Sequence, residues 1–121
     1  MSRTTERKVS RDVILAFVRV HVLHHAEEEP VFGLAMMEEL RRHGYEIGPG
    51  TLYPLLHSLE GGGILASTPR TVDGKVRRYY RITKAGSVVL AGLRAKLREL
   101  VDEVLPGGAS RKQATGHVTR R

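Results

Sequence analysis

The fold is decided by the segment PGTLYPLLHSLE, residues 49–60, which follows a glycine and precedes three more glycines at 61–63. Its leucines recur at the three- and four-residue spacing of a helix, so one stripe of the segment must be buried. Those leucines are Leu52, Leu55, Leu56 and Leu59. The opposite face can donate and accept hydrogen bonds through Thr51, Tyr53, His57 and Ser58. The segment is therefore predicted to be a short helix with one apolar and one polar face.

Pro54 fits this helix if Thr51 is the N-cap, because Pro54 is then the third helical residue, whose N–H has no intrahelical partner. A further helix is predicted just upstream, from about Phe32 to His43, with Gly44 as its stop. Residues 45–48 form the tight turn between the two helices. This arrangement predicts a helix-turn-helix whose later helix presents the reading face.

The composition restricts the class of protein. A chain of 121 residues, 40% of them hydrophobic, can form one modest domain but not two complete cores. No apolar run is long enough for a transmembrane helix, and residues 1–12 lack the apolar core of a signal peptide. Cysteine is absent, which excludes disulfides and thiolate metal sites. These features favour a cytoplasmic protein.

The charge of the chain is positive and unevenly distributed. A formal net charge of +7 and an isoelectric point near 10.2 favour a polyanionic partner. Residues 69–81 carry +4, whereas residues 13–47 carry −3. Such a localised positive charge is typical of a binding surface rather than of general solubility.

The N-terminal third is predicted to form one helix after a flexible, basic segment at residues 1–9. Ser10 is the expected N-cap, with Asp12 in the first turn, where the helix dipole favours an acid. Residues Val13 to Leu23 are apolar almost all round, which indicates burial on more than one side. In a domain this small, the pattern predicts that a second subunit covers part of the helix.

A β-hairpin is predicted after the three glycines, with strands at residues 64–68 and 76–82. Between them, Asp73-Gly74 is a strong turn signal, so the hairpin has a basic tip. Alternation along the second strand places Arg77 and Arg78 on opposite faces, so the arginines cannot all face one partner. The order helix, helix, turn, helix and hairpin is that of a winged helix. We expect residues 10–83 to form this domain, mainly α with a small β-hairpin.

A last helix is predicted from Lys84 to about Leu105, capped by Thr83. Its apolar residues step by three and four, which is the seam of a coiled coil over about two heptads. The seam consists of Leu90, Leu93, Leu97, Leu100 and Val104. We expect it to be a dimer interface; the alternative is packing onto the first helix of the same chain. Residues 106–121 are expected to be a disordered basic tail.

In these motifs the chain resembles the PadR family of bacterial transcriptional regulators, in its short form with one C-terminal helix. The resemblance covers roughly residues 12–105. The matching residues are Gly33, Met37, Glu38 and Leu40, then Pro49–Leu56, Leu59-Glu60, Gly63–Leu65, Arg77–Thr83 and Ala85-Gly86. Two positions depart from the pattern: Leu34 stands where the family usually has tyrosine, and Gly61-Gly62 replace its usual polar pair.

The resemblance implies a homodimeric repressor that binds a palindrome-like operator on double-stranded DNA. The helix at 49–60 would enter the major groove, and the hairpin would act as a wing on the backbone or the minor groove. It also implies release by a signal such as a phenolic acid or a drug. A site for such an effector is expected at the dimer interface, between the first and last helices. The protein would act in the bacterial cytoplasm, at the nucleoid when bound to DNA.

The expected DNA contacts fall into two groups. Helix contacts are expected from Thr51, Tyr53, Pro54, His57 and Ser58. Wing contacts are expected from Arg70, Lys75, Arg77 and Arg78. The alternatives are a solvated polar face, inward packing of Tyr53 against the wing, and a structural role for Arg77 or Arg78.

Other functions find less support in the sequence. His21, His24 and His25 have a spacing that can bind a metal, but histidines near a helix end are common, so no metal site or cofactor is expected. No nucleophile is paired with a base, and the glycine run lacks the lysine of a phosphate-binding loop, so no enzyme is expected. The alternative function is a winged-helix module that dimerises and binds another protein without reading DNA.

Overall fold

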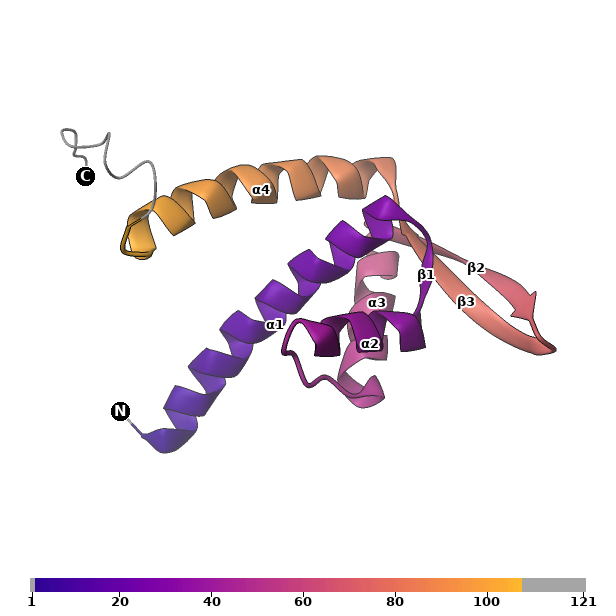
Figure 1. Ribbon diagram of the computed structural model, residues 1–121, viewed down its shortest axis with the longest axis horizontal. Helices are drawn as coiled ribbons and strands as arrows, with labels where there is room; N and C mark the ends of the chain where they lie inside the picture. The colour runs from indigo at the N-terminus through magenta and orange to yellow at the C-terminus, as the bar shows by residue number, and fades with distance from the viewer. Residues whose placement is uncertain (1, 108–121) are drawn as a thin grey trace. The chain divides into compact units, whose positions relative to one another are not determined.

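The computed structural model describes residues 2–107, so most of the predicted disordered tail at 106–121 lies outside the described residues. The fold is mainly helical with a small antiparallel sheet, as predicted (Figure 1). The chain divides into two units, residues 1–90 and 91–121. The elements in order are α1 (Arg3–Glu28), β1 (Val31–Phe32), α2 (Gly33–Arg42), α3 (Pro49–Gly61), β2 (Leu65–Val72), β3 (Lys75–Ile82) and α4 (Lys84–Val104).

Helix α1 is longer than predicted, because it begins at Arg3 and not after Ser10. The side chain of Ser2 caps it by accepting a hydrogen bond from the backbone N–H of Thr5 at 3.1 Å. Residues 3–9 contain neither glycine nor proline, and an ion pair of 2.8 Å joins Lys8 to Asp12 one turn later. The early polar residues therefore extend the helix instead of forming a separate segment.

Helix α2 and its end match the prediction closely. Gly44 has a φ of +93°, the left-handed conformation that a helix-ending glycine adopts at low cost. The backbone N–H of Gly44 donates to Arg41 O at 2.9 Å, and that of Tyr45 donates to Leu40 O at 3.0 Å. This pair of bonds is a Schellman motif, which turns the chain sharply toward α3.

The predicted start of α3 is wrong, since the helix begins at Pro49 with Gly48 as its N-cap. Proline suits the first helical position because its fixed φ is helical and its missing N–H has no partner there. Thr51 is therefore the third helical residue and Pro54 lies inside the helix. Pro54 cannot donate to the carbonyl of Gly50, which lies in the exposed first turn.

The sheet contains the predicted hairpin and one strand that was not predicted. The first hairpin strand, β2, is longer than predicted, since it runs to Val72 and not to residue 68. Strands β2 and β3 pair from Leu65↔Ile82 to Val72↔Lys75, and the hairpin extends away from α2 and α3 (Figure 1). Asp73 and Gly74 both have positive φ, 51° and 76°, as a two-residue type I′ turn requires. Strand β1 adds two residues beside β3, giving the order β1-β3-β2, and Pro69 lies in the outer strand β2.

The core joins all three helices of the helix-turn-helix region to the sheet. Leu52, Leu55 and Leu56 of α3 are buried as predicted, and Leu59 is half-buried. The largest fully buried side chains are Met36, Leu40, Leu52, Leu56, Leu65, Leu90, Val18 and Val22. The apolar face of α3 therefore lies against residues of its own chain.

Thr83 caps α4, as predicted, because its Oγ1 accepts a hydrogen bond from the N–H of Gly86 at 3.0 Å. The same hydroxyl lies 2.6 Å from the carbonyl oxygen of Gly63, to which it donates. The start of α4 is thus tied to the end of the glycine run after α3. No helix within residues 2–107 combines the length and the apolar character needed to cross a lipid bilayer.

Candidate nucleic-acid interface

The outward face of α3 is polar and accessible. Pro54, His57 and Ser58 are exposed, while Thr51 and Tyr53 are half-buried. Because the leucine face is covered by the core, these side chains are the ones that α3 can offer to a partner. A helix of 13 residues that is buried on its leucine face and exposed on its polar face has the width and chemistry that suit a major groove.

Tyr53 packs inward against α2. A Cβ atom added to Gly33 would lie 2.5 Å from both Cε1 and Oη of the Tyr53 ring. The first residue of α2 must therefore be glycine for the ring to take this position. Tyr53 fixes the spacing of the two helices, and only part of its side chain remains available to a partner.

Thr51 has a neighbour that the sequence did not predict. Nη2 of Arg11 lies 3.4 Å from Thr51 Oγ1 and donates a long hydrogen bond to it. Arg11 is exposed in the N-terminal part of α1, and this contact brings its positive charge to the first turn of α3. The only signal for it in the sequence is the basic character of the N-terminal residues.

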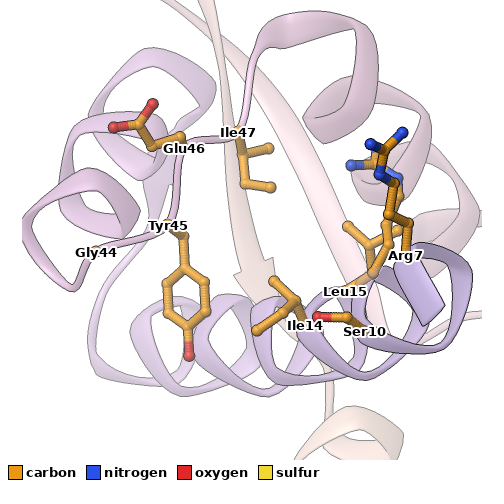
Figure 2. Close-up of a pocket in the computed structure, with 9 residues that line it drawn as sticks. Arg7, Ser10, Ile14, Leu15, Gly44, Tyr45, Glu46 and Ile47 are labelled. Carbon is orange, nitrogen blue, oxygen red and sulfur yellow. The ribbon is translucent and has the colours of Figure 1, made fainter. Parts of the chain in front are cut away.

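An open groove of about 490 Å³ separates α1 from the turn before α3. Figure 2 shows Ile14 and Leu15 of α1 facing Ile47 across it, with Tyr45 at one side and Arg7 at the other. Ile47 is half-buried. The groove therefore has an apolar floor and a basic edge close to the first turn of α3.

Two arginines of the wing are held by aromatic rings. Arg70 and Arg77 are directly paired across the hairpin. The guanidinium of Arg70 lies 3.9 Å from the centroid of the Tyr79 ring, and that of Arg77 lies 4.4 Å from the centroid of the Phe32 ring. Cation–π contacts of this kind orient the guanidinium groups while leaving their N–H donors available.

Arg78 has a structural contact on the other face of the hairpin. Its Nη1 donates to Ser67 Oγ at 3.0 Å, and Ser67 Oγ donates to Glu60 Oε2 at 2.7 Å. These two hydrogen bonds join β3 to the end of α3. Lys75 lies next to the turn and is exposed.

Three histidines from two helices lie close together, which was not predicted from the sequence. His21 and His25 of α1 lie beside His43, the C-cap of α2, and the ligand atoms of the three lie within 4.8 Å of one another. Burial lowers the pKa of His21 and of His25. The hydrogen bond from Arg42 lowers the pKa of Glu39, whose carboxylate lies beside this group. His43 is distant in sequence, and only the crossing of α1 and α2 makes it a neighbour.

Comparison with known proteins identifies relatives across most of the chain. Residues 22–92 match the model of the transcriptional regulator PadR-like family. The chain is 50% identical over 106 residues to the transcriptional regulator Rv3488 of Mycobacterium tuberculosis, covering 88% of this chain and 98% of the relative.

Solved structures of related regulators share the fold. A PadR family transcriptional regulator from Eggerthella lenta is 32% identical, with a TM-score of 0.66 over 94% of this chain and 99% of its own. A PadR-like transcription factor from Bacteroides fragilis is 26% identical, with a TM-score of 0.70 over 80% and 95% of the two chains. Sequence match and shared fold together place this chain in the PadR-like family of transcriptional regulators.

Proposed function

We propose that the protein is a homodimeric repressor that reads a palindrome-like operator through α3. The observation that carries this proposal is the division of α3 into a buried leucine face and an exposed face with His57 and Ser58. In the major groove, these two side chains would reach base edges. Thr51, in the first helical turn, is better suited to a phosphate, because helix N-termini favour anions.

The hairpin is proposed to contact the DNA backbone or a narrow minor groove. Arg70 and Arg77, oriented by their aromatic rings, and Lys75 at the tip supply the positive charge. Arg78 is proposed to position the hairpin on α3 through Ser67 rather than to bind DNA. Arg11 joins the proposed phosphate contacts because of its hydrogen bond to Thr51.

Dimerisation is proposed through apolar side chains that this chain leaves exposed. Val9, Val13 and Phe17 of α1 follow one another at four-residue steps and are all exposed. On α4, Leu100 and Val104 of the predicted seam are 48% and 61% exposed. Apolar stripes on two helices are typical of interfaces between subunits. A second copy of the chain would cover them and set the spacing of two α3 helices on adjacent half-sites.

Release by a small molecule is proposed to act at this dimer interface, where apolar surface from both copies would enclose a ligand. Larger side chains placed in that interface should abolish effector-driven release of DNA while leaving DNA binding intact. Ligand-dependent release that persists in such variants would place the effector elsewhere.

DNA binding can be tested by titrating the protein with the duplex upstream of its own gene and with a scrambled duplex, at two salt concentrations. A preference of about 10³-fold or more for the native duplex is expected of a sequence-specific repressor. Equal and steeply salt-dependent binding to both would indicate nonspecific binding. No binding at low salt would instead favour a module that binds another protein.

A further inference from the structure

A cluster of histidines joins α1 to the end of α2, and we infer that it binds one divalent transition-metal cation such as Zn²⁺ or Ni²⁺. The histidine cluster consists of His21 and His25, one helical turn apart on α1, and His43 at the C-cap of α2. Imidazole nitrogens are preferred ligands of these cations, and none of the three residues belongs to the proposed DNA-binding face.

The nitrogens of the histidine cluster lie near enough to one another to reach one ion. The ring centroids of His21 and His43 lie 4.7 Å apart, and those of His25 and His43 lie 5.8 Å apart. One ligand atom from each histidine lies within 4.8 Å of the other two. Ligand nitrogens of a tetrahedral zinc ion lie about 3.3 Å apart, given Zn–N bonds of about 2.0–2.1 Å. The three rings are stacked on one another, so their side chains must rotate to direct one nitrogen each at a common ion.

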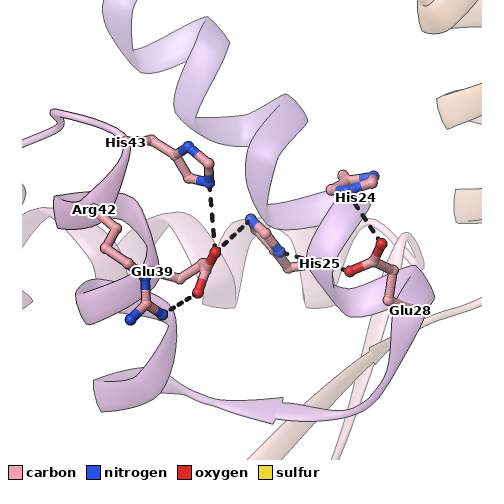
Figure 3. Close-up of polar contacts among 6 residues, drawn as sticks. All are labelled: His24, His25, Glu28, Glu39, Arg42 and His43. Carbon is pink, nitrogen blue, oxygen red and sulfur yellow. Dashed lines mark hydrogen bonds and ion pairs between the residues drawn. The ribbon is translucent and has the colours of Figure 1, made fainter.

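One nitrogen of the cluster lacks the partner that its burial requires. Nε2 of His25 is buried and makes no hydrogen bond. Figure 3 shows it converging with His43 on the carboxylate of Glu39. Oε2 of Glu39 lies 3.8 Å from His25 Nε2 and 3.4 Å from His43 Nε2. A cation bound by the histidine cluster would satisfy His25 Nε2, and the neighbouring carboxylate of Glu39 would favour its positive charge.

The other nitrogen of His25 faces a second carboxylate. Oε1 of Glu28 lies 4.0 Å from His25 Nδ1 (Figure 3). Histidine ligands of metals usually direct their second ring nitrogen toward a carboxylate or a carbonyl, which fixes the ring and strengthens the ligand. Glu28 is placed to do this when His25 binds a cation through Nε2.

The charges around the cluster favour a cation and give it a route of entry. A pocket of about 210 Å³ adjoins His25 and is lined by the four carboxylates of Glu28, Glu29, Glu38 and Glu39. Arg42 also lines it but is paired with Glu39. Burial lowers the pKa of His21 and of His25, and a metal binds histidine in its neutral form.

A second set of three possible ligands lies nearby and could bind the ion in place of the histidine cluster. It consists of His24, His25 and Glu28. It lies wholly on α1 and leaves the buried Nε2 of His25 facing Glu39. The histidine cluster uses that nitrogen and adds His43 from a second helix. An ion bound there would join α1 to the Schellman motif that leads into α3. Any effect of the metal on operator affinity would rest on the proposed DNA-binding function, but metal binding itself does not.

The test is a calorimetric titration of the full-length, tag-free protein with Zn²⁺, after dialysis against a chelator. Binding of one ion per chain is expected. His43→Gln and His21→Gln should each weaken the affinity at least about tenfold, whereas His24→Gln should leave it unchanged. Far-ultraviolet circular dichroism would show that each variant is folded. Thermal melting gives a second readout, since Zn²⁺ should raise the midpoint more for the wild type and His24→Gln than for the other two variants.

Three outcomes would overturn the inference. The first is absence of Zn²⁺ binding by the wild-type protein. The second is unchanged affinity in a folded His43→Gln variant. The third is loss of binding in His24→Gln, which would assign the ion to the set on α1 alone. None of these outcomes depends on DNA binding, so failure of the metal site and failure of the proposed repressor function can be distinguished.

Discussion

Helices α3 and α4 carry similar stripes of leucine but differ in how those stripes are covered. In α3, Leu52, Leu55 and Leu56 are all buried within the chain. In α4, Leu90 is fully buried, but the stripe becomes more exposed along the helix, and Leu100 is 48% exposed. Helical spacing therefore predicts that a stripe will be buried, but it does not predict what covers the stripe. If the leucine stripe of α3 is covered within the chain and that of α4 is covered by a second copy, substitutions in the two stripes should have different consequences.

The largest expected effect is that of Leu100→Asp on self-association. A carboxylate in the proposed interface would be buried without a partner, at a cost of about 3–5 kcal/mol, and a homodimer carries the substitution twice. Multi-angle light scattering at micromolar concentration should show a dimer for the wild type and a monomer for this variant.

The matched control for this variant is Ala95→Asp, which adds the same charge at an exposed position opposite the seam. It should remain dimeric. A wild-type protein that is monomeric, or a Leu100→Asp variant that stays dimeric, would exclude α4 as the interface.

The second effect is that of Leu56→Ala on the stability of the winged-helix unit. Leu56 is fully buried, and the cavity left behind should lower the free energy of unfolding by about 2–5 kcal/mol. Urea unfolding monitored by circular dichroism would measure it. The same loss should occur in the Leu100→Asp background, because it arises within one chain. A loss below 1 kcal/mol would argue that α3 is not packed as described.

The third effect concerns the contact that spaces α2 and α3. Gly33→Ala places a methyl group where the Tyr53 ring lies and should cost about 1–3 kcal/mol of stability. The double variant Gly33→Ala/Tyr53→Ala removes the collision, so its loss of stability should be smaller than the sum of the two single losses. Additive losses in thermal or urea unfolding would contradict the contact.

The smallest effect is that of Lys75→Ala, which should alter DNA binding but not stability. Lys75 is exposed beside the turn, and a lost phosphate contact should weaken binding to all duplexes alike and lower the salt slope by roughly 1. Fluorescence anisotropy at several salt concentrations would measure the slope. Thr71→Ala, on the exposed part of β2, serves as an uncharged control. A loss confined to one operator would instead assign Lys75 to base recognition.

The fold was predictable from the sequence because its elements follow from local patterns. The leucine spacing predicted α3, Gly44 predicted the end of α2, and Asp73-Gly74 predicted the hairpin turn. The starts of α1 and α3 were predicted wrongly, because several residues near each start can act as a cap. Strand β1 has two residues, too few for any periodic signal.

The parts of the site that could not be predicted depend on contacts between distant segments. The pairing of Arg77 with Phe32 requires β1 to lie beside β3. The approach of His43 to His21 requires α2 to cross α1. Arg78 could be placed on one face of its strand, but its hydrogen bond to Ser67 depends on the register of the hairpin.

Pro69 gives the hairpin a further property, which concerns association between sheets. Strand β2 is an outer strand among the described residues, so one of its edges could template a strand from another molecule. In the register Pro69↔Arg78, the two-residue turn places Pro69 at a position whose backbone nitrogen points to the free edge. Proline has no N–H to offer there. The edge is thus interrupted midway, which protects an extended and otherwise unpaired hairpin from edge-to-edge aggregation.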